Sequence, residues 1–125
     1  HRLGIGFLVD WIWRFTHHLR DFDAKKIQVM SIIEGLNKNF ENRVRLGLMS
    51  VLLVNDWVDF TEMKELLSVT DGNLASHSSA LEKVEYIEIK KEFVGKKPKT
   101  SYRVTQKGRE AFQKHLVALE KLLSN

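Results

Sequence analysis

The feature that most constrains the fold is a hairpin pattern near the middle of the second half of the chain. From Tyr86 to Phe93 apolar residues alternate with polar ones, and the alternation returns at Thr100–Val104. The two stretches are separated by Val94-Gly95-Lys96-Lys97-Pro98, in which Gly95 and Pro98 are interpreted as turn residues. The pattern predicts a β-hairpin, over residues 87–104, in a chain whose other segments are patterned as helices.

Two short helices are predicted immediately before the hairpin. Thr61 is a suitable N-cap for a helix at Glu62–Leu67, which follows a short β-prone stretch at residues 57–60. Either Thr70 or Asp71 can cap a second helix within residues 70–84. The apolar positions of this second helix are Leu74, Leu81 and Val84. Two short helices joined by a tight connection are typical of a helix-turn-helix.

Longer helical patterns lie on both sides of these elements. Residues 31–55 have helical spacing with a break expected near residues 37–42, and the part at 44–53 is apolar on nearly all sides, which predicts a central helix. Thr105 can cap a last helix, residues 106–124. Its apolar residues step by four, three and four: Phe112, Leu116, Leu119 and Leu123. We expect this seam, with the helix near residues 32–40 as a second candidate, to form the interface of a homodimer.

The first 29 residues differ from the rest, and we expect them to lie outside the native domain, which would then span residues 30–125. Apolar residues at helical spacing predict an amphipathic helix that carries Trp11 and Trp13. Two interpretations stay open for it, packing against the domain or a dimer partner and binding at a membrane surface. The apolar run at 3–15 is shorter than the ~20 residues that a spanning helix needs. We therefore expect no stable membrane insertion.

Composition narrows the class of protein. With 125 residues, of which 43% are hydrophobic and 29% charged, the chain can bury one core but not two. It has no cysteine, which excludes disulfides and zinc fingers and is compatible with a cytoplasmic protein, our expectation here. The sequence has no phosphate-binding loop, nucleophile elbow or metal-ligand spacing, so we expect neither an enzyme nor a metal or other cofactor.

The order of elements and several local motifs resemble the winged helix-turn-helix family of small bacterial transcriptional regulators, of MarR/ArsR-like type. The resemblance covers Leu36 to Leu123 and rests on DFTEMKELLSVTDGNLASH followed by LEKVEYIEIKKEFVGKKPKTSYRVTQKGREAF. It implies a mainly α fold with a small β-wing (α+β) and an added C-terminal dimerisation helix. It also implies a small-molecule effector, which no residue pattern identifies.

Two positions depart from the family pattern. Ser78 stands where such helices usually place a leucine beneath the recognition helix, and Glu85 stands where a glycine often ends that helix. A serine in place of a buried leucine loses roughly 2–4 kcal/mol of packing. A non-glycine residue in a left-handed cap costs about 1 kcal/mol. We expect either a slightly rotated helix or a helix end that is not of the glycine type.

The resemblance implies that residues 70–84 enter the major groove of double-stranded DNA. Leu74 and Leu81 mark the inward side, so small polar side chains and a lysine are expected outward, where asparagine can pair with adenine and serine with several bases. The predicted DNA contacts on this helix are Thr70, Asn73, Ser76, His77, Ser79 and Lys83. For His77 a half-buried structural role and a DNA contact are equally weighted alternatives.

The predicted wing concentrates the positive charge of the chain, whose formal net charge is +4. Lys96, Lys97 and Lys99 are its predicted DNA contacts, on the phosphate backbone or in the minor groove. The same lysines would also discourage edge-to-edge aggregation. We therefore expect a dimeric regulator that binds specific DNA sequences. The alternative is a protein-interaction module that uses the basic wing on an acidic partner.

Overall fold

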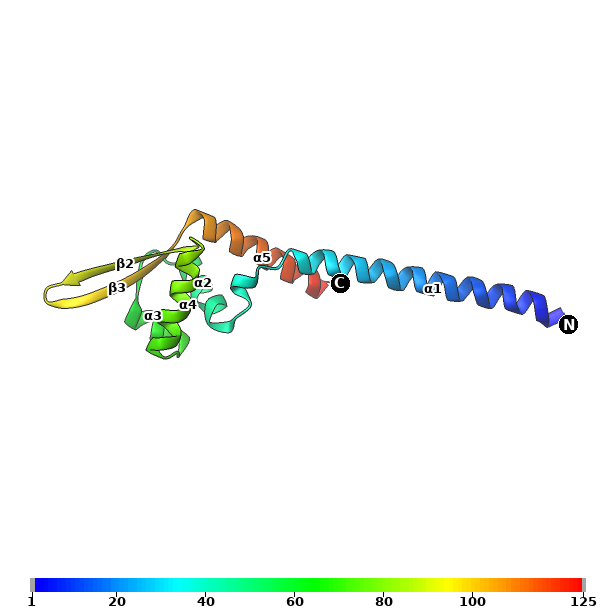
Figure 1. Ribbon diagram of the computed structural model, residues 1–125, viewed down its shortest axis with the longest axis horizontal. Helices are drawn as coiled ribbons and strands as arrows, with labels where there is room; N and C mark the ends of the chain where they lie inside the picture. The colour runs from blue at the N-terminus through cyan, green and yellow to red at the C-terminus, as the bar shows by residue number, and fades with distance from the viewer. Residues whose placement is uncertain (1, 125) are drawn as a thin grey trace.

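The structure, a computed structural model, describes residues 2–124 and is mostly helical with one small antiparallel sheet (Figure 1). The helices are α1 (Arg2–Glu34), the 3-10 helix η1 (Lys38–Phe40), α2 (Arg43–Leu53), α3 (Phe60–Leu67), α4 (Asp71–Lys83) and α5 (Gln106–Ser124). The strands are β1 (Val58–Asp59), β2 (Ile87–Val94) and β3 (Lys97–Val104). This is the predicted mainly α fold with a small β-wing, and α3 and α4 form the predicted helix-turn-helix.

The sheet has the order β1-β3-β2, so β3 is its central strand. β2 and β3 pair along all eight residues, from Ile87 opposite Val104 to Val94 opposite Lys97. Gly95 opens the two-residue turn with a φ of 67°, a conformation that glycine adopts without strain. The prediction that Pro98 is a turn residue is wrong, because Pro98 pairs with Phe93 inside the strands.

Side-chain caps set the starts of the helices. The hydroxyl of Thr70 accepts from the backbone N–H of Asn73 at 3.2 Å, and that of Thr105 accepts from Gly108 at 2.9 Å, as two of the predicted caps require. The third prediction, Thr61, is wrong. Asp59 caps α3 instead by accepting from the N–H of Glu62 at 2.8 Å. A carboxylate also complements the positive end of the helix dipole, which favours Asp59 over a hydroxyl two residues later.

The core lies between α2, α3, α4, the sheet and the first half of α5. α2 is the predicted central helix, with Leu48, Met49 and Leu52 fully buried, and Phe112 of α5 packs edge-on against Phe40 of η1. The other apolar side chains of the core are Val58, Met63, Leu74, Leu81, Ile87, Tyr102 and Val104. Burial of this set fixes α4 against α2 and the wing, which leaves the opposite face of α4 exposed.

Ser78 lies on the buried side of α4 together with Leu74 and Leu81. Its side chain is 2% exposed, and its hydroxyl donates to the carbonyl of Ala75 at 3.2 Å. Tyr102 of β3 lies beneath the helix at this point. Burial raises the pKa of Tyr102, and a hydrogen bond with Ser78 partly offsets the rise. The tyrosine therefore packs where the family leucine is expected, and it uses the serine hydroxyl as a polar partner.

Glu85 does end α4 in the left-handed conformation, with a φ of 64°. Its N–H donates to the carbonyl of Glu82 at 2.9 Å, and the N–H of Tyr86 donates to that of Leu81 at 3.0 Å. This pair of bonds is a Schellman motif, the usual setting for glycine. Of the two expected alternatives, a cap that is not of the glycine type is therefore wrong, and Glu85 carries the strain.

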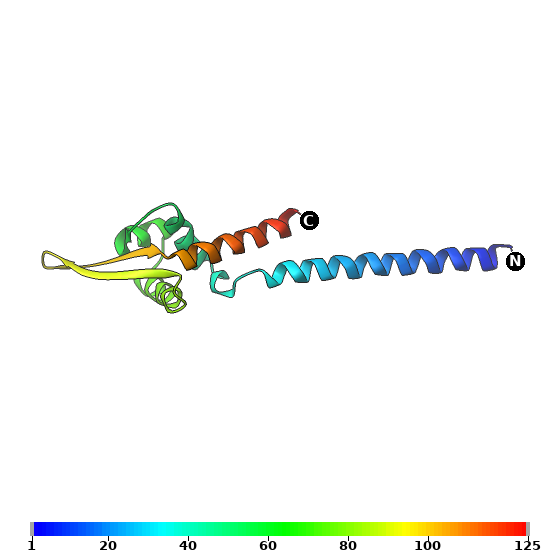
Figure 2. The same ribbon diagram turned by 90° about the horizontal axis from the view of Figure 1, so that it is seen from above.

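α1 projects away from the rest of the molecule, opposite to the wing (Figures 1 and 2). It continues without a break through positions 29 and 30, where the native domain is expected to begin. The helix ends at Glu34, shortly before the break expected near residues 37–42. From Ile5 to Met30 its large apolar side chains are exposed, so this part does not pack on its own domain. No helix in the described part of the chain is long and apolar enough to cross a membrane. Packing on a partner and binding at a membrane surface both stay predictions.

Candidate nucleic-acid interface

The outward face of α4 carries the predicted DNA contacts of this helix. Leu74, Ser78 and Leu81 are buried and fix the rotation of the helix. On the other side, the structure exposes the following predicted residues: Thr70, Asn73, Ser76, Ser79 and Lys83. The middle of the face is a shallow hollow lined by Ser76, Ser79, Ala80, Glu82 and Lys83. Side chains this small let a helix approach base edges closely, whereas the Glu82 carboxylate at the rim would repel a phosphate.

The wing lies beside this face and carries charge of two kinds. Near its base, Lys90 and Arg103 lie over the ring of Trp57, at 4.3 and 4.5 Å from its centroid. Both also pair with glutamates of the same hairpin, Arg103 with Glu88 at 2.9 Å and Lys90 with Glu92 at 3.9 Å. These two cations are therefore engaged within the hairpin.

The remaining lysines of the wing are exposed. Within residues 2–124 no ion pair is formed by Lys91, Lys96, Lys97 or Lys99. Their charge is available to a polyanion. Lys96 and Lys97 lie at the turn between β2 and β3, the end of the hairpin that projects from the core (Figure 1). Lys91 was not predicted as a contact, although it lines a cleft between α4 and the wing together with Ser79 and Thr100.

His77 is half-buried on the flank of α4 that faces α2. Its Nδ1 accepts a hydrogen bond from Nε of Arg45 at 3.0 Å. Because arginine only donates, the imidazole is neutral there, with its proton on Nε2. Burial, followed by the charge of Arg45, lowers the pKa of His77. The half-buried position predicted for His77 is thus confirmed, and its contact with DNA stays a prediction.

Sequence reasoning missed three side chains of this region. Arg45 lies one turn before Leu48 on the inward stripe of α2, and a cation on an apolar stripe was the signal that could have identified it. Trp57 was assigned only to a β-prone stretch. Arg109 donates to the carbonyl of Leu53 at 3.2 Å and so satisfies the last turn of α2.

The predicted dimer seam on α5 is divided by the structure. Phe112 is 1% exposed in the single chain, so a partner could bury nothing more of it, and it belongs to the core of its own chain. Leu116 and Leu123 remain 41% and 89% exposed, and Leu119 is half-buried between them. These three leucines form one edge of the helix that the rest of residues 2–124 leaves partly uncovered.

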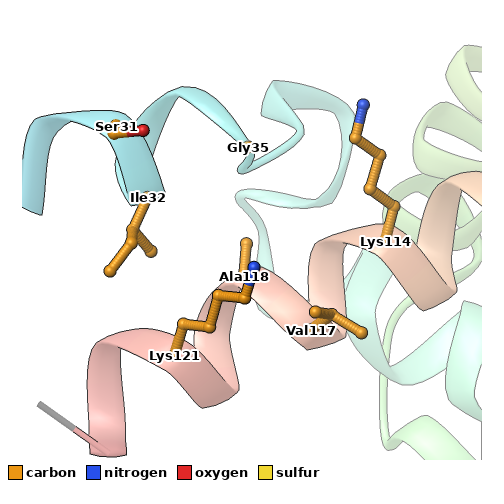
Figure 3. A pocket seen from close by; sticks show the side chains of 7 residues that line it. All are labelled: Ser31, Ile32, Gly35, Lys114, Val117, Ala118 and Lys121. Carbon is orange, nitrogen blue, oxygen red and sulfur yellow. The ribbon is translucent and has the colours of Figure 1, made fainter. Parts of the chain in front are cut away.

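A shallow groove lies where the end of α1 meets α5 (Figure 3). Ile32 and Gly35 line it from α1 and the residue that follows it, and Val117, Ala118 and Lys121 line it from α5. Lys114 and Ser31 complete the lining. Among residues 2–124 no group of three His, Asp or Glu side chains could hold a metal ion.

Comparisons with known proteins agree with this geometry. A family model described as a winged helix DNA-binding domain matches residues 44–123. An uncharacterized protein of Methanocaldococcus jannaschii is 34% identical over 88 residues, which cover 70% of this chain and 96% of that protein.

Two solved structures with the same fold are described as transcriptional regulators. A transcriptional regulator homologue from Pyrococcus horikoshii has 28% identity and a TM-score of 0.67, over 76% of this chain and 92% of that one. A MarR family regulator from Streptomyces coelicolor, solved in complex with DNA, shares the fold at 17% identity and a TM-score of 0.54, over 82% of this chain and 71% of that one.

Proposed function

The chain belongs to the winged helix DNA-binding domain family, and we propose that it is a dimeric transcriptional regulator that binds specific sequences of double-stranded DNA. α4 enters the major groove and presents Asn73, Ser76 and Ser79 to base edges. The lysines of the wing tip lie on the phosphate backbone or in the adjacent minor groove, where they add affinity but little sequence information. A cytoplasmic location, with access to the chromosome, accords with this function.

The observation that carries the proposal is the pairing of two surfaces on one side of the domain. One is the small polar face of α4, and the other is the group of wing lysines without ion pairs among the described residues. A protein-interaction module that binds an acidic partner would need the lysines but not the adjacent small polar face. The family is one of DNA-binding domains rather than of enzymes.

The dimer is supported by the exposed edge of α5. Leu116, Leu119 and Leu123 follow one another at steps of three and then four residues. They leave apolar area that a second chain could cover. A twofold dimer would present two α4 helices to successive turns of the duplex, about 34 Å apart. This spacing makes the dimer part of the recognition mechanism.

A small-molecule effector is part of the proposal only at the level of the family. One structure with the same fold, NadR, is described as a complex with 4-hydroxyphenylacetate. The groove between α1 and α5 is open to solvent in the single chain. We therefore assign no effector to it, since a ligand there would need a second chain to cover it.

The experiment that tests the proposal is selection of bound sequences from random duplex DNA by the full chain. We expect enrichment of a twofold-symmetric site whose half-sites are separated by roughly 10 base pairs. Retention of duplexes without any enriched sequence would contradict specific recognition. No binding of duplexes, combined with salt-sensitive binding of an acidic polypeptide such as poly-glutamate, would favour the protein-interaction alternative.

A further inference from the structure

We propose that Arg45 is a third DNA contact of this domain, a phosphate-binding residue that His77 holds in position on the flank of α4 opposite the wing. This inference rests on the proposed DNA-binding function and adds to it. It arises from a hydrogen bond between side chains of two different helices, α2 and α4, which lie against each other.

His77 lies on one flank of the exposed face of α4, and Ser79 lies on the other. At 3.6 residues per turn, Ser79 and His77 lie about 80° to either side of the line through Ser76 and Ala80, the middle of the exposed face. The Ser79 flank adjoins the wing, since Ser79 and Lys91 line the same cleft. The His77 flank adjoins the first turn of α2, where Arg45 begins the inward stripe.

A helix in the major groove has one phosphate backbone on each side of it. If the wing lysines meet the backbone on the Ser79 side, the backbone on the other side passes the His77 flank. Lys38 of η1 and Arg43 of α2 are exposed basic residues close in the chain to Arg45, which is itself half-buried.

The guanidinium of Arg45 is hydrogen-bonded through two of its three nitrogens. Nε donates to His77, and Nη1 reaches the carbonyl of Asn39 at 3.5 Å. Nη2 has no hydrogen-bond partner among the described residues. It is not completely buried, because in that part of the chain every buried side-chain nitrogen and oxygen has a partner. A guanidinium held at one edge and free at another is preorganised to donate to a phosphate oxygen.

His77 is therefore a positioning residue. Its Nδ1 fixes the orientation of the guanidinium, and the same bond places the imidazole proton on Nε2. Asparagine in place of His77 retains an acceptor oxygen near the position of Nδ1, whereas leucine removes the acceptor at similar volume. The two substitutions separate orientation of Arg45 from simple packing of the helix flank.

The test measures the affinity of the full chain for a duplex of mixed sequence, about 30 base pairs long, at a series of salt concentrations. The slope of log K against log salt is negative, and each lost phosphate contact lowers its magnitude by about 0.9. A lower slope here means a smaller magnitude. We expect Arg45→Gln to lower the slope by this amount and to weaken binding roughly tenfold at low salt. His77→Leu should weaken binding, and His77→Asn should restore it to near the original value.

The matched control is Arg20→Gln, which removes an exposed arginine of α1 and should leave the slope unchanged. Thermal unfolding of each variant, in the same buffers, confirms that the variants are folded under the conditions of binding. An Arg45→Gln slope equal to that of Arg20→Gln would overturn the inference. Equal losses from His77→Leu and His77→Asn would overturn the positioning role.

A double substitution in the wing, Lys96→Ala with Lys97→Ala, distinguishes failure of the Arg45 contact from failure of the proposed DNA-binding function. If it lowers the slope and Arg45→Gln does not, the proposed function stands and the third contact fails. If neither the original protein nor any variant binds the duplex, the proposed function fails and takes this inference with it.

Discussion

At the scale of single residues, the strain at Glu85 is open to direct test. The left-handed φ of 64° costs a non-glycine residue about 1 kcal/mol. Glu85→Gly should therefore raise the free energy of unfolding by up to ~1 kcal/mol. The substitution also removes an ion pair with Lys107 at 3.5 Å, but both side chains are exposed, so that loss is small. Urea denaturation measures the change.

The control for this prediction is Glu85→Ala, which removes the same carboxylate but keeps a Cβ atom. Alanine should give no such gain, because the strain arises from the Cβ atom and not from the charge. Equal stability of the glycine and alanine variants would contradict a strained cap.

His115 gives the stability a pH dependence. It is 3% exposed, and its Nδ1 accepts from the backbone N–H of Asn37 at 2.9 Å. Burial lowers its pKa below the usual 6.5, and the Glu41 charge opposes the shift less strongly. The unfolded chain therefore binds the proton more readily than the folded one. The stabilisation is fully present above about pH 6.5 and is lost as pH falls from there to the folded pKa.

Urea midpoints between neutral and mildly acidic pH measure this effect. His77 also has a lowered pKa, so the original protein contains two such contributions. His115→Gln does not titrate, and its stability should fall less steeply across the same pH window. Parallel pH profiles for the two proteins would show that His115 does not contribute.

At the scale of elements, Gly108 determines how closely α5 follows the hairpin. A Cβ atom there would overlap the backbone carbonyl of Tyr86, which cannot move because it accepts from the N–H of Thr105 at 3.0 Å. We expect Gly108→Ala to destabilise the fold by about 1–3 kcal/mol. Gly72 in α4 has nothing within 4 Å of its Cβ position, so Gly72→Ala should be neutral or stabilising. Differential scanning calorimetry of both variants tests the contrast, and equal shifts in Tm would contradict it.

The elements themselves were largely predictable from sequence. Alternation and a glycine turn identified the hairpin, and the Thr70 and Thr105 caps identified the starts of α4 and α5, because these signals act between residues close in the chain. The structure replaced the predicted Thr61 cap by Asp59, two residues earlier, and placed Pro98 inside β3 rather than in the turn.

The candidate site was less predictable for a physical reason. Arg45 meets His77 across 32 positions of sequence. Lys90 of β2 and Arg103 of β3 lie over the ring of Trp57, which is far from both in sequence. Such pairs depend on how helices pack, which local spacing does not encode. Phe112 was assigned to a dimer seam for the same reason. Periodicity shows that a residue lies on the apolar face of a helix, but it does not show whether its own chain or a partner covers that face.

At the scale of the whole molecule, the exposed edge of α5 predicts the oligomeric state. Burial of Leu116 and Leu123 by a second chain should hold the protein as a dimer at micromolar concentration. Replacing both with lysine should shift it to a monomer, because four charges would then meet in one apolar contact. Sedimentation equilibrium measures the mass. A monomeric original protein, or a dimer unaffected by the double substitution, would contradict the proposed interface. The domain boundary at residue 30 stays a prediction, and α1 crosses it as one helix.

The central claim is a division of roles in which α4 discriminates between sequences and the wing supplies charge. The most direct test compares the affinity of each variant for a selected duplex and for a scrambled one at one salt concentration. Asn73→Ala or Ser76→Ala should weaken binding to the selected duplex by ~1–3 kcal/mol and leave the scrambled one nearly unchanged. Lys96→Ala with Lys97→Ala should weaken both to a similar extent. A uniform loss from both sets of variants would contradict the division of roles.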